Sequence, residues 1–225
     1  MKSNTITIKK ITYLNHNVVQ LETTKPDNYE FVSGQATEVS VLKSGWEDKK
    51  RPFTFTSLPT EENLEFTIKV YDSHDGVTEQ IGKLEKGDQL LIGEPFGAIR
   101  YRGSGTFLAG GAGVTPFIPI LKQLESENKA FGHTLIFANK KEKDIFLNNK
   151  FNEILGDDFI NILSEEETDG HHHGHINAKF IQEHTDLLKQ FFYVCGPPKM
   201  IEHVITELKS IGVEEELIIT EDFED

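Results

Sequence analysis

The stretch that decides the fold is Thr106-Phe107-Leu108-Ala109 followed directly by Gly110-Gly111-Ala112-Gly113-Val114-Thr115-Pro116. An apolar run that ends in glycines predicts a buried strand, a tight turn and then a helix. Glycine lets backbone N–H groups approach a ligand closely, and the N-terminus of the following helix favours a phosphate. The stretch therefore predicts a phosphate-binding turn at the end of a strand.

A second turn of the same kind lies further along the chain. The apolar run Phe191–Val194 is followed by Cys195-Gly196-Pro197-Pro198, and a helix is predicted over 200–208. In an open parallel sheet, ligands bind outside the carboxyl ends of the strands, where two such turns would form a cleft for a dinucleotide. The two turns together therefore predict that the chain binds a nucleotide cofactor.

The remaining pattern divides the chain into two parts. Alternating or β-branched stretches predict short strands at 5–8, 17–22, 38–41, 64–70 and 88–93, which favours a small closed barrel. Further strands are predicted at 106–109, 133–138, 158–163, 191–194 and 216–220, and they alternate with helices at 115–128 and 200–208. Such alternation is typical of a parallel α/β sheet. We expect a barrel domain over 1–102 and an α/β domain over 103–225.

Composition narrows the class of protein. The formal net charge of −14 argues against general nucleic-acid binding. The single cysteine excludes an internal disulfide and a cysteine-ligated iron–sulfur cluster within the chain. No stretch approaches the roughly 20 apolar residues of a membrane span, and the first residues lack the apolar core of a signal peptide. We therefore expect a cytoplasmic protein without a membrane partner.

A third segment, Arg51-Pro52-Phe53-Thr54-Phe55-Thr56-Ser57, lies between two predicted strands of the barrel. The Arg51 guanidinium could bind a pyrophosphate bidentately, Phe53 could lie against a flavin ring, and Thr54 could hydrogen-bond the reactive edge of that ring. An ordinary β-strand with regular alternation explains the same residues. This segment alone leaves the two interpretations open.

Taken together and in this order, the Arg51–Ser57 segment, the Gly110–Pro116 turn and the Cys195–Pro198 turn resemble the motifs of the ferredoxin–NADP(+) reductase family. The likeness is to its short bacterial flavodoxin or ferredoxin reductase-like members, and it covers essentially the whole chain. The resemblance implies a six-stranded antiparallel Greek-key β-barrel that binds FAD. It also implies that an α/β Rossmann-like parallel-sheet domain follows, which binds NADH or NADPH.

The resemblance also assigns roles in the flavin site. Arg51 would bind the flavin pyrophosphate, Phe53 would stack on the isoalloxazine and Thr54 would contact its N5 atom, which makes Thr54 a candidate catalytic residue. The family usually has Tyr and Ser at the positions of Phe53 and Thr54, so stacking and one hydroxyl are kept. The other candidate flavin-binding residues are Ser57, Ile68, Lys69, Gly76, Val77 and Thr78. For Thr78 a simple helix cap is the alternative.

In the second domain the resemblance points to the nicotinamide. Cys195 would lie where the nicotinamide approaches the flavin, as a second candidate catalytic residue with a positional role, although a buried structural cysteine is the alternative. Phe223 would cover the flavin face, or would belong to a solvated acidic tail. The residues that would shape the dinucleotide turns are Gly111, Gly113, Thr115, Pro116, Gly196 and Pro197.

Two acidic positions and a histidine run complete the candidates. Glu165 stands where relatives that use NADP carry a basic partner for the 2′-phosphate, so NADH is favoured. The alternative is that lysines of a neighbouring loop, Lys140, Lys141 and Lys143, bind that phosphate. Asp144 is expected to N-cap the following helix. The run His171–His175 lies in a polar loop without fixed geometry, and we expect no metal site there.

The resulting prediction is an FAD-dependent NAD(P)H oxidoreductase, in which hydride passes from nicotinamide to flavin. Electrons would then leave to a separate carrier such as ferredoxin or flavodoxin. One alternative is direct reduction of free flavin, quinone or another small molecule. The other alternative is a nucleotide-binding subunit without catalytic activity.

Overall fold

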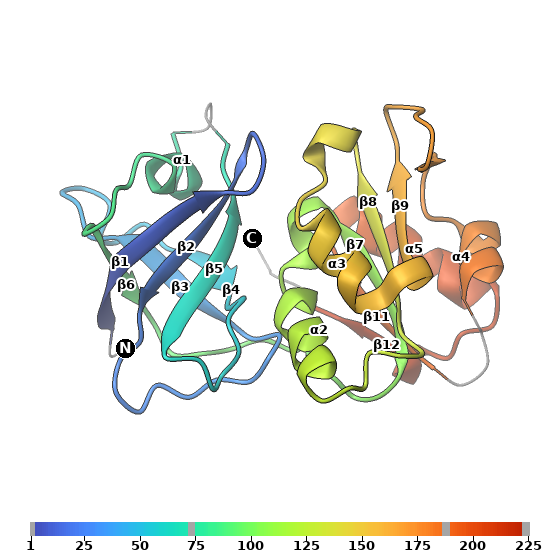
Figure 1. Ribbon diagram of the computed structural model, residues 1–225, viewed down its shortest axis with the longest axis horizontal. Helices are drawn as coiled ribbons and strands as arrows, with labels where there is room; N and C mark the ends of the chain where they lie inside the picture. The colour runs from blue at the N-terminus through green and yellow to red at the C-terminus, as the bar shows by residue number, and fades with distance from the viewer. Residues whose placement is uncertain (1–2, 72–74, 186–189, 222–225) are drawn as a thin grey trace.

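The computed structural model describes residues 3–71, 75–185 and 190–221. Two six-stranded sheets lie side by side, and the chain passes from the first to the second once (Figure 1). The sheets divide between Ile92 and Gly105, and Ile99 in the connection already packs with the core of the second sheet. The boundary after residue 102 stays a prediction.

The first sheet is an antiparallel barrel of β1 (Asn4–Tyr13), β2 (Val18–Thr24), β3 (Ala36–Val41), β4 (Arg51–Thr54), β5 (Asn63–Lys69) and β6 (Gln89–Ile92). Its strand order is β4-β3-β6-β1-β2-β5. A bridge between Phe55 and Phe66 brings the end of β4 to β5 and thereby joins the two outer strands. The short helix α1 (Val77–Ile81) lies between β5 and β6. The predicted antiparallel barrel is confirmed.

Alternation explains why the barrel closes on one core. In β2 and β5 most inward residues are apolar, and Leu21, Leu64 and Phe66 are fully buried. Phe55 stacks on Phe31 at a centroid distance of 4.3 Å, so aromatic rings fill the end of the barrel at which β4 finishes. The strand segment after Thr54 is therefore held in place by the core.

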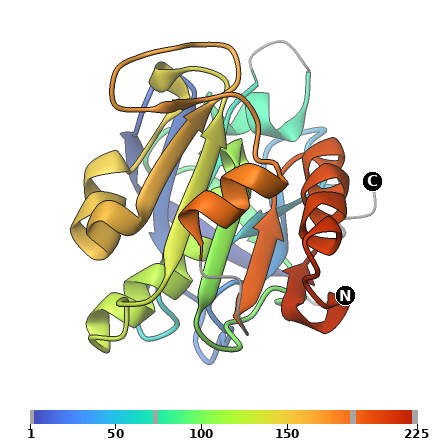
Figure 2. The ribbon, with the colours of Figure 1, turned by 90° about the vertical axis from the view of Figure 1, so that its right-hand side faces the viewer.

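The second sheet is parallel and holds β7 (Gly105–Gly110), β8 (Thr134–Asn139), β9 (Phe159–Leu163), β10 (His172–His173), β11 (Phe191–Cys195) and β12 (Ile218–Thr220). Helices α2 (Phe117–Ser126) and α3 (Asn148–Leu155) pack on one face, and α4 (Ala178–His184) and α5 (Pro198–Ser210) pack on the other. Figure 2 shows α2 and α3 on one side of the sheet and α5 on the other. The predicted α/β sheet is confirmed.

The strand order β10-β9-β8-β7-β11-β12 explains where a ligand can bind. The chain starts at β7 in the middle, continues to one side through β8, and returns to the other side at β11. The carboxyl ends of β7 and β11 are therefore neighbours at the point where the order reverses, which is where open α/β sheets bind their ligands. Both turns identified in the sequence begin there.

Three local expectations differ from the structure. The glycine turn does not open a helix directly, because a 3-10 turn over Gly111–Val114 precedes α2. Asp144 is not an N-cap: Leu147 precedes α3, and the Asp144 carboxylate accepts from the Lys141 backbone N–H. The polar loop over 165–175 contains the edge strand β10, which is too short to give a sequence pattern. Helices α3 and α4 were not predicted.

Candidate cofactor site between the two sheets

The two turns at the carboxyl ends of β7 and β11 touch each other through their backbones. A Cβ atom on Gly113 would collide with the Cys195 carbonyl, and one on Gly110 would collide with Met200. A Cβ on Gly196 would lie 3.2 Å from the Gly110 backbone. The clash at Gly113 is with backbone atoms, so only glycine fits there, and the two turns form a cradle of closely packed peptide groups. Such a cradle suits the close approach of a pyrophosphate.

Gly111 plays a different part in the same turn. Its φ of +52° is a left-handed conformation, and nothing lies within 4 Å of the position that its Cβ would take. The left-handed residue directs the turn into the 3-10 helix, which leaves the space above it open. Pro116 and Pro197 follow at the N-cap positions of α2 and α5, where a missing N–H costs no helix hydrogen bond.

The first turn also reaches the barrel. The Thr115 hydroxyl donates to the Ala112 carbonyl at 2.9 Å, and its oxygen lies 3.4 Å from the Thr54 hydroxyl at the end of β4. Thr54 is only 8% exposed. The candidate flavin segment and the candidate dinucleotide turn therefore meet across the seam between the two sheets.

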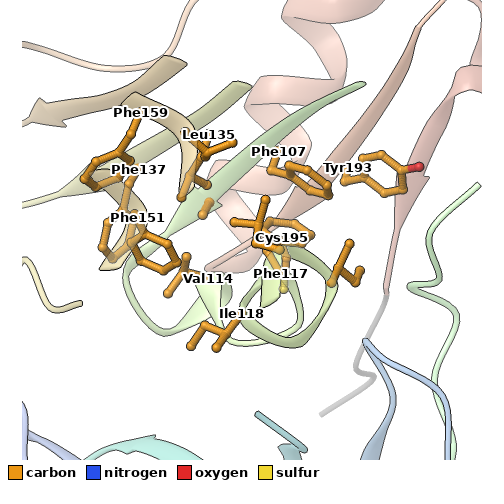
Figure 3. Packing of buried hydrophobic residues seen from close by; sticks show 14 of the residues in the cluster. Phe107, Val114, Phe117, Ile118, Leu135, Phe137, Phe151, Phe159, Tyr193 and Cys195 are labelled. Atoms are coloured by element: carbon orange, nitrogen blue, oxygen red, sulfur yellow. The ribbon is translucent and has the colours of Figure 1, made fainter. Parts of the chain in front are cut away.

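Cys195 lies beside this meeting point, at the end of β11. It is 6% exposed and packs with Val114 and Phe117 in the core beneath the first turn (Figure 3). Burial, and then the nearby Glu221 carboxylate, raise the pKa of the Cys195 thiol to about 12. The thiol is therefore protonated at neutral pH and is not a nucleophile. A positional role is the one compatible with this environment.

Sequence reasoning missed Glu221, a buried carboxyl group that follows β12. Its Oε1 atom accepts the Ala98 backbone N–H at 3.0 Å, and a Cβ on Gly97 would lie only 2.6 Å from the same atom. Burial raises the pKa of Glu221, while the backbone hydrogen bonds from Ala98 and Ile99 oppose the rise. The available signal was a polar residue directly after a predicted closing strand, at the same sheet edge as Cys195.

The residues of the flavin segment divide into two groups. Arg51 is exposed, and its guanidinium donates to the Lys50 carbonyl at 2.9 Å, while Phe53 is half-buried. Ser57 is fully buried and accepts the Glu65 backbone N–H at 3.1 Å, so its hydroxyl stabilises the barrel. Arg51 and Phe53 are accessible to a ligand, whereas Ser57 has a structural partner.

The second flavin stretch is described in part. Ile68 is 2% exposed and belongs to the barrel core, and Lys69 at the end of β5 is half-buried. Gly76 takes the N-cap position of α1 without a side-chain cap, which puts Thr78 at the second helical position rather than at the cap. Val77 is buried in the barrel core. Phe223 lies outside the described residues.

The candidate adenosine end contains an ion pair. Lys140 Nζ lies 2.8 Å from Glu165 Oε1, and both side chains are largely exposed. The Lys140 ammonium holds the pKa of Glu165 below its usual value. Because the two residues follow the neighbouring strands β8 and β9, they lie at the same carboxyl edge of the sheet as the glycine turn. The Lys140 ammonium thus partly offsets the negative charge of Glu165, on which the expected preference for NADH depends.

Two buried polar atoms support the fit of a polar ligand at this edge. Within the described residues, Asn139 Nδ2 at the end of β8 and Thr220 Oγ1 at the end of β12 have no hydrogen-bond partner. Buried polar atoms without a partner are uncommon in folded proteins. Asn139 and Thr220 lie at the carboxyl edge of the sheet that also carries the glycine turns, which fits a polar ligand at this edge.

The described residues offer neither a metal centre nor a membrane span. Among residues 3–71, 75–185 and 190–221, no group of three or more His, Cys, Asp or Glu side chains is arranged to hold a metal ion. Across that same part of the chain, every helix is too short or too polar to cross a membrane.

Family models of known proteins match both the barrel and the α/β part of the chain. Residues 3–91 match the family model of an FAD-binding domain, and residues 107–206 match that of an oxidoreductase NAD-binding domain. The chain is 28% identical over 220 residues to NADH-cytochrome b5 reductase 2 of Mycosarcoma maydis, covering 88% of this chain and 63% of that protein. It is 30% identical over 201 residues to one component of the Na(+)-translocating NADH-quinone reductase of Neisseria meningitidis, covering 77% of this chain and 49% of that component.

Solved structures show the same fold at lower identity. The FAD/NAD-binding domain of the nitric oxide dioxygenase of Vibrio cholerae superposes with a TM-score of 0.87 at 19% identity, covering 97% of this chain and 98% of that one. A ferredoxin NADP+ reductase of Neisseria gonorrhoeae with bound FAD and NADP gives 0.82 at 18%, covering 98% of each chain. The chain spans about half to two thirds of the length of the curated relatives named above. The expectation of FAD and a nicotinamide cofactor is confirmed by the two family models.

Proposed function

The chain belongs to the ferredoxin–NADP(+) reductase-like family, and on that premise we propose that it is an FAD-dependent NAD(P)H oxidoreductase that serves a separate electron acceptor. The observation that carries the proposal is the 3.4 Å approach of Thr54 and Thr115 across the seam, with Cys195 in the neighbouring turn. Two domains that bind two dinucleotides gain rate mainly by holding them in contact.

Each residue near the seam has a defined task in this proposal. Bound FAD would accept a hydride from the nicotinamide and release the electrons one at a time. Arg51 binds the flavin pyrophosphate, Phe53 packs on the flavin ring, and the Thr54 hydroxyl donates to its reactive edge. Gly111 and Gly113 present backbone N–H groups to the second pyrophosphate. Cys195, which stays protonated, shapes the nicotinamide pocket.

Two classes of electron acceptor fit the proposal, a protein carrier and a small molecule. The names of the two curated relatives give cytochrome b5 and quinone as their electron acceptors. The family resemblance instead favours a ferredoxin or flavodoxin as the acceptor of this chain. Lysines on the barrel that could bind an acidic carrier are partly compensated, because Lys43 pairs with Asp88 at 2.8 Å and Lys50 with Glu38 at 3.3 Å. Direct reduction of flavin, quinone or another small molecule is the second candidate.

The test is direct. Purified protein should contain one non-covalent FAD per chain and consume NADH steadily with a dye acceptor. A screen of ferredoxin, flavodoxin and free quinone then separates carrier reduction from small-molecule reduction. Colourless protein that takes up no added FAD contradicts the proposal, and bound FAD without NADH consumption favours the nucleotide-binding subunit.

We expect kcat/KM to be roughly fivefold higher with NADH than with NADPH. This factor corresponds to the repulsion between one exposed pair of like charges, a carboxylate and the 2′-phosphate of NADPH, after screening by salt. The charge is that of Glu165, and its partner Lys140 keeps the preference small. Glu165→Arg should reverse the preference, whereas Glu153→Arg, on α3, should leave it unchanged. A wild-type preference for NADPH that persists in Glu165→Arg would contradict the assignment of Glu165.

A further inference from the structure

A lysine on α2 reaches from the second domain into the barrel. Lys122 Nζ donates to the Thr56 backbone carbonyl at 2.8 Å and to Glu65 Oε1 at 2.9 Å. The Lys122 and Glu65 side chains are 22% and 19% exposed, so the pair is largely shielded from water. Shielded pairs are screened less by salt than surface pairs, and this one also has a backbone partner.

The partners of Lys122 belong to a rigid part of the barrel. The Thr56 hydroxyl lies 2.9 Å from Glu65 Oε1 and 3.1 Å from the Thr67 hydroxyl. The Glu65 backbone N–H donates to Ser57 Oγ at 3.1 Å. Thr56, Ser57 and Thr67 are buried. Lys122 therefore binds the strand segment that directly follows Thr54, and not a mobile surface loop.

The other end of the same helix carries the dinucleotide turn. Thr115 and Pro116 already have helical backbone angles, so the helical path runs without interruption from Thr115 to Lys122. Seven residues are two turns, which places both side chains on one face about 10.5 Å apart along the axis. That face meets the barrel twice, at Thr54 and at Thr56.

Of these two contacts, only the Lys122 contact is strong enough to fix a position. The Thr115–Thr54 oxygen distance of 3.4 Å is long for a hydrogen bond between hydroxyls, whereas the Lys122 bonds are short and charge-assisted. A third polar contact, in which the Ser33 hydroxyl donates to Gln123 Oε1 at 3.0 Å, lies beside Lys122 and involves neutral groups.

We propose that Lys122 is a positioning residue, which fixes the dinucleotide turn against the flavin segment by anchoring α2 to Thr56 and Glu65. The proposal rests on the proposed function for its kinetic consequence, but its structural consequence is independent of cofactor chemistry. Losing the anchor should let α2 and its glycine turn move relative to β4. A displacement of about 1 Å between reacting groups is enough to slow a reaction strongly.

The kinetic test compares Lys122→Met with Lys122→Arg and with a control. In Lys122→Met, flavin reduction at saturating NADH should slow about tenfold, with FAD content and the Kd of NADH within about twofold of wild type. Lys122→Arg should restore most of the rate because it keeps the charge. The control is Lys150→Met, which removes a 2.8 Å ion pair between Lys150 on α3 and Glu125 on α2 and therefore loosens α2 only within the second domain.

The structural test measures the spacing of the domains without any turnover. Nitroxide labels at Lys10→Cys on β1 and Glu153→Cys on α3, both exposed positions, report the distance across the seam by double electron–electron resonance. Lys122→Met should broaden the distance distribution, and Lys150→Met should not. Equal distributions in wild type and Lys122→Met, or an equal loss of rate in Lys150→Met, would overturn the positioning role. Wild-type protein that consumes no NADH would contradict the proposed function alone.

Discussion

Gly113→Val is expected to slow NADH-dependent reduction of the bound flavin at least 100-fold while FAD stays bound. Any Cβ at residue 113 would collide with the backbone of Cys195 and Gly196, and backbone atoms cannot rotate aside as a side chain can. The glycine turn must therefore move, and with it the nicotinamide pocket, whereas the flavin segment lies in the barrel. Stopped-flow reduction and the FAD absorbance of purified protein measure the two quantities separately.

The matched control for this substitution is Gly93→Ala in the barrel. There a Cβ would meet its nearest neighbours at ordinary contact distances of 3.7–3.9 Å, so the change should be nearly silent. Gly113→Ala should fall between the two, since it adds the colliding atom without the branches. Reduction of Gly113→Val at the wild-type rate would show that the turn between β7 and α2 does not bind the nicotinamide dinucleotide. Loss of FAD instead would place the flavin at that turn.

The features that sequence alone predicted are those whose signals are local. The strand that ends in Gly110–Gly113 and the strand that ends in Cys195 each carry an apolar run and a turn within about ten residues. Parallel-sheet geometry then places both turns at the carboxyl edge of the sheet, whereas their being neighbours follows from the strand order. The barrel was predictable for the same reason, since alternation with period two needs only neighbouring residues.

Contacts across the seam between the domains could not be predicted in this way. Lys122 and Glu65 are 57 residues apart, and Ala98 and Glu221 are 123 apart. In the sequence Lys122 is one lysine on the polar side of a helix, and Glu221 is one acid in an acidic tail. Their partners follow from how the two domains pack, which no local pattern encodes. Asp144 failed as a predicted cap because its carboxylate binds the Lys141 N–H and lies 3.5 Å from His16 in the barrel.

Arg51→Ala is expected to weaken FAD binding on the order of 100-fold, so that the variant is purified with little flavin. Arg51 begins β4 and is exposed, and its guanidinium donates to the carbonyl of the neighbouring Lys50, which leaves further N–H groups for a ligand. Two hydrogen bonds to a charged phosphate are worth about 1.5–3 kcal/mol each. Because the site borders solvent, we take about 2.7 kcal/mol for both, which corresponds to roughly 100-fold.

Fluorescence titration of apoprotein with FAD measures the change, and riboflavin provides the decisive comparison. Riboflavin lacks the pyrophosphate, so its affinity should be the same in Arg51→Ala and in wild type. Arg102→Ala is the control for loss of an exposed arginine, because the Arg102 contact with Tyr193 is made by its backbone N–H and survives the substitution. If both ligands lose affinity equally, Arg51 acts on the barrel and not on the phosphate. If neither FAD nor riboflavin loses affinity, the pyrophosphate is bound elsewhere, and the residues at the start of α1 are the next ones to test.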